Sequence, residues 1–211
     1  MLRHSPATSW NHSEKLPRVH ELSYIDQHAI LIGEVIVERN AVILPCAVIR
    51  ADEGCPIVIG EGTNVQDGVI MHGLKGSLIQ VGRHCCIAHG AVVHGPCQLG
   101  DETFIGFNSI LLKATLGNNC FVSHGAMVIG VEVPDNKFIP TGQVIDSQEK
   151  ADALETVSAS MKEFVHEVLE VNGELLRGYR RMAVRNILGD VHEDVHEDVH
   201  EDAPHLIAIN E

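Results

Sequence analysis

Aliphatic residues recur at six-residue intervals through most of the 211-residue chain. A glycine often follows the aliphatic residue, as in Ile59-Gly60 and Val81-Gly82. A period this short is typical of a solenoid in which each unit supplies a short strand and a turn. The members of the series are Ile32, Val37, Ile43, Ile49, Ile59, Val65, Met71, Val81, Ile87, Val93, Leu99, Ile105, Leu111, Leu116, Val122 and Val128.

The repeat predicts an all-β fold, a left-handed parallel β-helix of hexapeptide units. Three units complete one triangular coil of such a helix, so these units correspond to about five coils. An antiparallel sandwich would instead alternate apolar and polar residues, with turns about every 8–12 residues. Aromatic residues make up only 4% of the chain, so we expect a core of Val, Ile, Leu and Ala.

Four segments follow from these patterns. We expect an N-terminal extension (1–19), the β-helix (20–146), a helical segment (147–183) and an acidic, histidine-rich tail (184–211) with three copies of VHED. The dense carboxylates of the tail favour a solvated segment. A helix from about 158 to 182 should pack along the outside of the prism, because its apolar residues share one face. These residues are Met161, Phe164, Val165, Val168, Leu175, Leu176 and Tyr179.

Composition argues against several classes of partner. The net charge is -14, and no cluster of Lys and Arg is present to meet nucleic-acid phosphates. No apolar run approaches the roughly 20 residues of a membrane helix, and the polar N-terminus does not resemble a signal peptide. We therefore expect a cytoplasmic protein without nucleic-acid or membrane partners. The six cysteines lack CxxC spacing, and we expect them to be reduced and buried.

Three histidines have the spacing of a shared metal site. His72 and His94 occupy the same slot of units that are one coil apart, so they should stack about 4.8 Å apart along the axis. His89 lies in a different slot and should point elsewhere. A three-fold assembly would bring His89 of one chain to His72 and His94 of its neighbour, and three imidazoles with an open position form a catalytic zinc site. Taken singly, each could be a turn or surface residue, and His84, which has no stacked partner, should be one.

Five short motifs contain or surround these histidines: Arg50-Ala51-Asp52-Glu53-Gly54, Asn64-Val65-Gln66-Asp67-Gly68, His72, Ala88-His89 and Val93-His94-Gly95-Pro96. In this order and spacing they resemble the motifs of the γ-class carbonic anhydrases. The resemblance covers roughly residues 20 to 180 of a family that includes archaeal enzymes and the N-terminal domain of a carboxysome scaffold protein. It implies a homotrimer with one Zn²⁺ or Fe²⁺ per interface, where metal-bound hydroxide reversibly hydrates CO₂ to bicarbonate.

The same resemblance assigns the first group of site residues. The metal ligands would be His72 and His94 from one chain and His89 from the next. Gln66 would hydrogen-bond the metal-bound water or hydroxide. Glu53 would accept or relay the proton released by the reaction.

Four further residues receive supporting roles. Asp67 would support the site from behind the ligands, and Arg50 and Asp52 would form an ion pair between subunits. Asn172 would help to place CO₂ or bicarbonate. Because Asn172 falls on the predicted apolar face of the helix, it could instead be a buried residue that only bonds to backbone.

Two alternatives remain open on the sequence alone. The loop after His72 lacks the acidic insertion that carries a proton-shuttle glutamate in the archaeal type enzyme, so a catalytically weak, metal-binding scaffold subunit is one alternative. A hexapeptide-repeat acyltransferase is the other. Acyltransferases of this fold typically use one histidine and a protruding loop, so three ligand-spaced histidines count against that interpretation.

Overall fold

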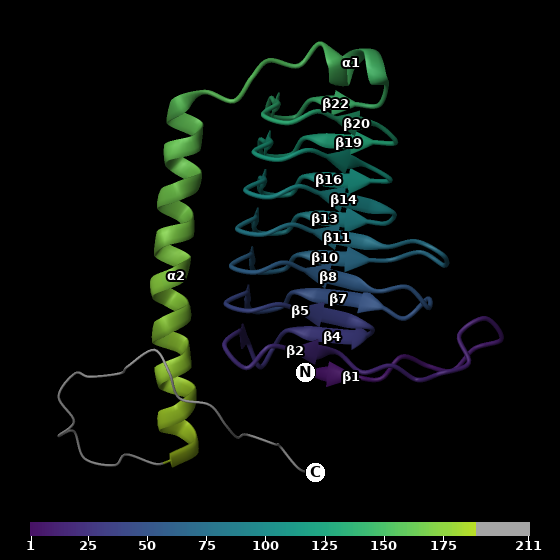
Figure 1. Cartoon of the computed structure of the whole chain (residues 1–211), viewed down its shortest axis with the longest axis vertical. Helices are drawn as coiled ribbons and strands as arrows, with labels where there is room; N and C mark the ends of the chain where they lie inside the picture. The colour runs from purple at the N-terminus through teal and green to yellow at the C-terminus, as the bar shows by residue number, and fades with distance from the viewer. Residues whose placement is uncertain (189–211) are drawn as a thin grey trace.

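The computed structural model describes residues 1–188, in which short strands wind around a common axis into a triangular prism (Figure 1). The strands form three sheets, named A, B and C here, of eight, seven and seven strands. Every strand pairs in parallel with the strand one coil away. The fold is the predicted left-handed parallel β-helix.

Sheet A contains β1 (Leu2–Arg3), β4 (Ile30–Gly33), β7 (Val48–Ala51), β10 (Ile70–His72), β13 (Val92–His94), β16 (Ile110–Leu112), β19 (Met127–Ile129) and β22 (Val144–Ile145). Sheet B contains β2 (Arg18–Val19), β5 (Val35–Val37), β8 (Ile57–Ile59), β11 (Ile79–Val81), β14 (Cys97–Leu99), β17 (Thr115–Leu116) and β20 (Glu132–Val133). Sheet C contains β3 (Tyr24–Ile25), β6 (Val42–Ile43), β9 (Asn64–Val65), β12 (Cys86–Ile87), β15 (Phe104–Ile105), β18 (Phe121–Val122) and β21 (Phe138–Ile139).

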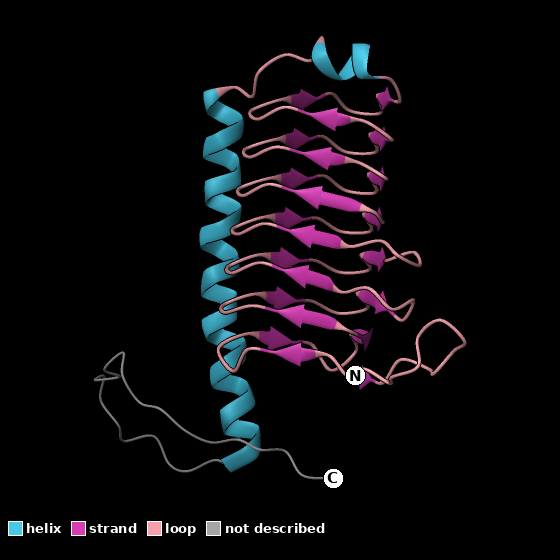
Figure 2. Ribbon diagram, turned by 45° about the vertical axis from the view of Figure 1, so that its right-hand side comes forward, coloured by secondary structure: helices cyan, strands magenta, loops and turns pink. Residues whose placement is uncertain are grey.

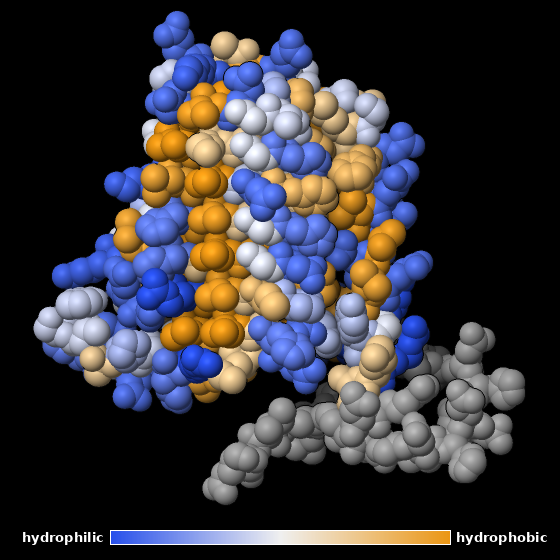
Figure 3. All heavy atoms as spheres, turned by 180° about the vertical axis from the view of Figure 1, so that it is seen from behind, coloured by the Kyte–Doolittle hydropathy of each residue, from blue (hydrophilic) through white to orange (hydrophobic). Residues whose placement is uncertain are grey.

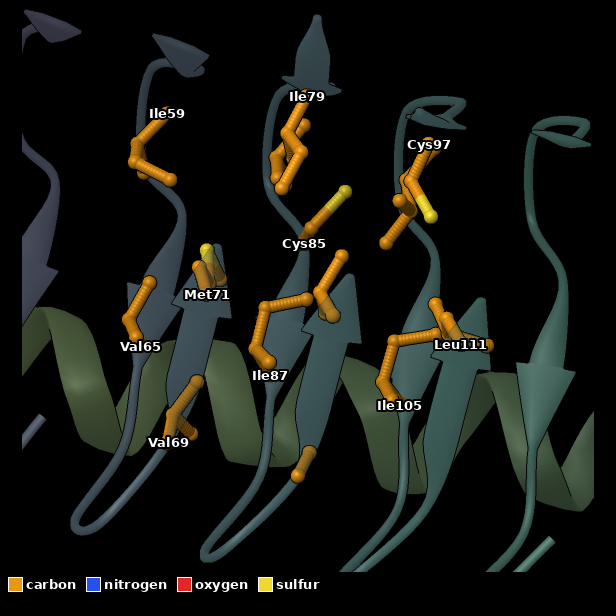
Figure 4. Packing of buried hydrophobic residues seen from close by; sticks show 14 of the residues in the cluster. Ile59, Val65, Val69, Met71, Ile79, Cys85, Ile87, Cys97, Ile105 and Leu111 are labelled. Atoms are coloured by element: carbon orange, nitrogen blue, oxygen red, sulfur yellow. The ribbon is translucent and has the colours of Figure 1, made fainter. Parts of the chain in front are cut away.

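The repeated aliphatic residues fill the inside of the prism as columns. Val65, Ile87 and Ile105 pair in register on adjacent coils of sheet C, and none of the three is exposed (Figure 4). Burying such a side chain contributes about 1.5–3 kcal/mol relative to leaving it exposed. The period of six therefore reports the direction of the side chain, and a second inward residue often lies two positions earlier, as Val35 does before Val37.

The N-terminal part differs from the prediction in register and in the number of coils. Leu31, not Ile32, is the inward residue of the first unit, because Leu31 is fully buried and pairs with Ile49. Ile32 pairs with Arg50 on the outer surface. β1 and β2 come from residues 1–19, the segment predicted as an extension, and the prism has about seven coils instead of about five.

Two helices follow the last coil. α1 (Gln148–Asp152) lies on the end of the prism, and α2 (Ala159–Leu188) returns along its whole length beside sheet C (Figures 1 and 2). α2 confirms the helix predicted from 158 to 182 and continues past it into the predicted tail. Residues 189–211, with the VHED copies, lie outside the described residues. Neither helix is sufficiently long and apolar to span a membrane.

Aromatic contacts attach α2 near both of its ends. Near its start, Phe164 contacts the stacked rings of Phe104 and Phe121, whose centroids are 4.6 Å apart. Farther along, Tyr179 stacks on Tyr24 of the first coil, also at 4.6 Å. These contacts tie the helix to coils that are far apart in the prism.

One apolar stripe of α2 faces solvent. Phe164, Val171, Leu175 and Met182 are 42–59% exposed, and their spacing places them on one side of the helix. Phe164 and Leu175 were predicted to lie on the packed face, and each is 42% exposed, although the ring of Phe164 also contacts the prism. Val165 and Leu176, the residues that immediately follow them, are the buried ones.

The outer surface of sheet A is also apolar. An unbroken ladder of aliphatic residues crosses seven strands, each residue paired with the next, and apolar residues gather in a band along the prism in Figure 3. We name this ladder the sheet A band. Its members are Ile30, Val48, Ile70, Val92, Ile110, Met127 and Val144.

The cysteines are free, and four of the six are buried. Burial raises the pKa of the Cys85 and Cys86 thiols to about 12. Cys46 is exposed and Cys55 is half-buried, so the prediction that the cysteines are buried is wrong for these two. Both lie in corner segments outside the strands.

Candidate metal centre

His72 and His94 meet on the outer surface of sheet A. They are paired residues at the ends of β10 and β13, and their ring centroids are 5.1 Å apart. His72 Nδ1 lies 3.2 Å from His94 Nε2. On the neighbouring coils the same column holds Arg50 and Leu112.

The spacing and the environment of the two rings suit a shared metal ion. Two nitrogens that each lie 2.0–2.1 Å from a tetrahedral Zn²⁺ are roughly 3.3 Å apart. The remaining nitrogens, His72 Nε2 and His94 Nδ1, are buried without a hydrogen-bond partner. Burial and then the Arg50 charge lower the pKa of His72, which favours the neutral imidazole that binds metals. Within residues 1–188 of one chain, no third ligand completes a site.

Carboxylates border this pair of histidines. Glu53 Oε1 lies 3.3 Å from His72 Nε2, and Asp52 Oδ1 lies 3.7 Å from the same nitrogen. The backbone N–H of Lys75 donates a 2.8 Å hydrogen bond to Glu53 Oε2. The short loop after His72 carries no carboxylate of its own, but it holds Glu53 beside the histidine.

Arg50 and Asp52 already contact each other within one chain. Arg50 Nη1 lies 3.3 Å from Asp52 Oδ2, and the Arg50 side chain is 45% exposed. The structure therefore shows an intrachain pair where the resemblance implied one between subunits. A surface pair of this kind contributes about 0–1 kcal/mol.

His89 lies at a different corner of the prism. It follows β12 in the turn that leads to sheet A, and it is followed by Gly90, whose φ of +70° suits glycine. Its Nδ1 lies 3.0 Å from Asp67 Oδ2, and its ring stacks on Phe107 with centroids 5.2 Å apart. A carboxylate that holds one imidazole nitrogen leaves the other, here Nε2, for a ligand. The His89 side chain is 53% exposed and faces away from the core.

Gln66 belongs to the same corner as His89 and is almost fully buried, with 7% of its surface exposed. Its Nε2 donates to Asn64 Oδ1 at 3.1 Å and contacts Cys86 Sγ at 3.4 Å. Its Oε1 is buried and has no partner. The sequence analysis assigned no role to Asn64 or Cys86. The sequence Asn64-Val65-Gln66 could have indicated this contact, because two amide residues flank a core valine and so point to the same side of the chain.

Asn172 is placed near Asn64 and not near the paired histidines. It is 8% exposed, and its Nδ2 donates to the Val168 carbonyl at 2.8 Å, as the structural alternative predicted. Asn64 and Asn172 nevertheless line one cleft of about 660 Å³ beneath α2. The Asn172 Oδ1 takes no part in the bond to the Val168 carbonyl.

Trp10, in the N-terminal loop, was not predicted to lie near the site. The Lys75 ammonium lies 5.2 Å from the centre of the Trp10 ring, a cation–π contact. Lys75 is also the residue whose N–H holds Glu53. A single Trp in a polar segment gives no periodic signal, so only the folded chain reveals this neighbour.

The chain is similar in sequence to a carbonic anhydrase and to a carboxysome assembly protein. A carbonic anhydrase of Methanosarcina thermophila is 36% identical over 201 residues, which cover 85% of this chain and 81% of that protein. The carboxysome assembly protein CcmM of Nostoc sp. is 37% identical over 185 residues, which cover 83% of this chain but only 33% of that protein. The chain thus spans a third of this second relative. No family model matches the chain.

Solved structures with the same fold have lower identity. A hexapeptide transferase family protein from Anaplasma phagocytophilum superposes with a TM-score of 0.65 at 26% identity, covering 78% of this chain and 93% of that chain. The product of the BC4754 gene of Bacillus cereus superposes with a TM-score of 0.71 at 21% identity, covering 85% and 98%. The second likeness concerns the fold alone.

Proposed function

Because the chain belongs to the γ-class carbonic anhydrase family, we propose that it catalyses the reversible hydration of CO₂ to bicarbonate at metal sites shared between subunits. The observation that carries this proposal is the pairing of His72 and His94. His72 Nδ1 and His94 Nε2 are 3.2 Å apart, close to the separation of two nitrogens that bind one tetrahedral metal ion.

His72 and His94 of one subunit and His89 of the next would hold Zn²⁺ or Fe²⁺. When bound, the metal lowers the pKa of a water molecule from about 15.7 to about 7. Asp67 orients His89 by holding its Nδ1 at 3.0 Å, which leaves Nε2 directed outward.

Gln66 and Glu53 act on the reacting water from opposite sides of the subunit boundary. Gln66 Oε1 is a free acceptor on the His89 side and would hold a water proton. Glu53 lies on the His72 side and is 32% exposed, so it can take a proton and pass it to buffer. Asn172 would help to place CO₂ or bicarbonate at the cleft beneath α2, because its Oδ1 is not used in the bond to the Val168 carbonyl.

The proposed homotrimer would cover the exposed apolar surfaces. The sheet A band runs along the prism beside the column that holds His72 and His94. The stripe of α2 that contains Val171 and Leu175 is a second uncovered apolar surface. Large apolar surfaces on a folded chain mark interfaces, and closed symmetric assemblies bury the same patch in every subunit.

A scaffold role is the second candidate, because the chain is 37% identical to a third of a carboxysome assembly protein. The short loop after His72 would then accompany weak or absent catalysis. This candidate predicts tight metal binding without CO₂ hydration.

Stopped-flow measurement of CO₂ hydration tests the proposal. Protein purified without oxygen is loaded separately with zinc and with iron(II), and His94→Ala serves as the control. Metal-dependent hydration that His94→Ala abolishes supports the enzyme and identifies its better metal. Tight metal binding without hydration in either form would instead support the scaffold role.

A further inference from the structure

Three buried side chains form a closed hydrogen-bonded cluster on sheet C and at the corner that carries His89. Asn64 of β9 and Cys86 of β12 are paired residues on adjacent coils, and Gln66 follows two residues after Asn64. Asn64 and Cys86 are at most 1% exposed. Three contacts join them: Gln66 Nε2 to Asn64 Oδ1 at 3.1 Å, Cys86 Sγ to Asn64 Oδ1 at 3.2 Å and Gln66 Nε2 to Cys86 Sγ at 3.4 Å.

The number of protons fixes the direction of these bonds. Asn64 directs its Nδ2 toward the Cys85 carbonyl at 3.5 Å, so its Oδ1 faces the other two side chains as an acceptor. A thiol has one proton, and Cys86 donates it to Asn64 Oδ1. The sulfur is then left to accept from Gln66 Nε2.

Gln66 therefore uses both of its N–H protons inside the cluster. A carboxamide carries two N–H donors and one oxygen acceptor. One donor goes to Asn64 and the other to Cys86, and Oε1 remains buried without a partner.

We infer that Cys86 is a positioning residue: together with Asn64 it occupies both N–H groups of Gln66, so that Gln66 presents only its carbonyl oxygen to the reaction centre. The role in catalysis rests on the proposed function, whereas the hydrogen bonds are independent of it. Burial raises the pKa of the Cys86 thiol to about 12, so the thiol keeps its donated proton at neutral pH.

If Gln66 can only accept hydrogen bonds, it distinguishes water and hydroxide from bicarbonate. Water and hydroxide have protons that Oε1 accepts, whereas a bicarbonate oxygen that lacks a proton receives no hydrogen bond from Gln66. Removing the thiol would leave the carboxamide of Gln66 free to rotate, and an N–H could then replace Oε1 and donate to a bound oxyanion. Loss of Cys86 should therefore strengthen anion binding and slow product release.

The first test measures the cluster without relying on activity. Side-chain amide NMR of the full-length protein, ¹⁵N-labelled at glutamine, is recorded with and without zinc. We expect both Gln66 N–H protons to exchange slowly with solvent in the wild type and in Cys86→Ser, which keeps a donor and an acceptor. In Cys86→Ala one proton should exchange at least tenfold faster. A fast-exchanging proton in the wild type would overturn the inference, and this measurement needs no variant to fold.

The second test uses nitrate as a planar oxyanion in place of bicarbonate. We expect the inhibition constant for nitrate to fall roughly fivefold to tenfold in Cys86→Ala, the equivalent of one hydrogen bond, and to stay unchanged in Cys86→Ser. Equal nitrate inhibition in all three proteins would contradict the role in discrimination. If the protein proves unable to hydrate CO₂, the proposed function fails, and the NMR result still decides the hydrogen bonding.

Discussion

At the scale of single residues, Glu53 is held beside one of the paired histidines. It lies 3.3 Å from His72 Nε2, and the Lys75 N–H fixes its second oxygen at 2.8 Å. A short loop thus places a carboxylate where a longer acidic loop is missing. General acid–base groups contribute about 10²–10⁴-fold to rate when they are positioned in this way.

Replacement of Glu53 should affect proton transfer selectively. We expect Glu53→Gln to lower kcat for CO₂ hydration about 10²-fold at low buffer, because the amide cannot accept the proton. High imidazole concentration should restore most of the rate, as stopped-flow assays at several buffer concentrations will show. Glu61→Gln, in a corner between β8 and β9, is the control and should have no effect. A buffer-independent loss would mean that Glu53 acts on structure instead.

Some contacts at the candidate site follow from the repeat, and others do not, for a physical reason. His72 and His94 meet because they occupy the same slot one coil apart, and this follows from counting along the repeat. The roles of Cys86 and Trp10 depend on side-chain contacts with residues distant in sequence, which the period of six does not report. The Leu31 register was missed because Ile32 is followed by a glycine, like other members of the series, although Leu31 lies six residues before Val37 and Ile32 only five.

At the scale of elements, the corners of the coils limit what the sequence can contain. A Cβ added at Gly60 would overlap the carbonyl of Gly82 on the next coil. Gly178 lies in α2 with no atom near the position of an added Cβ. The same substitution should therefore have opposite effects at the two positions.

We expect Gly60→Ala to destabilise the protein by about 1–3 kcal/mol, because adjacent coils must separate to accept the methyl group. Gly178→Ala should stabilise it by about 1 kcal/mol through helix propensity alone. Urea denaturation followed by circular dichroism measures both. Equal changes at the two positions would show that coil spacing does not set the requirement for glycine.

The position of α2 was easier to predict than the direction of its faces. Its apolar residues predicted a helix at the correct place, but two stripes of apolar residues lie on it. Val165 and Leu176 are buried against the prism, whereas Leu175 is 42% exposed and Phe164 is partly exposed beside its contact with Phe104. Adjacent apolar residues do not reveal which one turns inward until the partner surface is known.

At the scale of the whole molecule, the site divides into two halves. His72, His94 and Glu53 form one half on sheet A and its corner loop, and His89 with Gln66 forms the other half at a separate corner. The two halves would meet only between copies of the chain, and the sheet A band gives those copies a surface to bury.

Mixed assemblies test this division. His72→Ala and His89→Ala should each be inactive alone, whereas random 1:1 mixing should restore roughly a quarter of wild-type activity, because one interface in four then joins two intact halves. The mixture is unfolded and refolded together, and analytical ultracentrifugation confirms trimers before the assay. Fully inactive mixed trimers would refute the shared site.

The paired ladders also explain how this molecule tolerates a change in length. Val93 pairs with Leu111 eighteen residues later, whereas Met71 pairs with Val93 twenty-two residues later. The surplus residues leave the prism as the loop that holds Glu53, and the ladder continues in register. Whole coils gained or lost away from β10 and β13 would likewise leave the paired histidines in place. Molecular length and site chemistry can therefore be inherited separately: a lineage can extend the prism without rebuilding the centre.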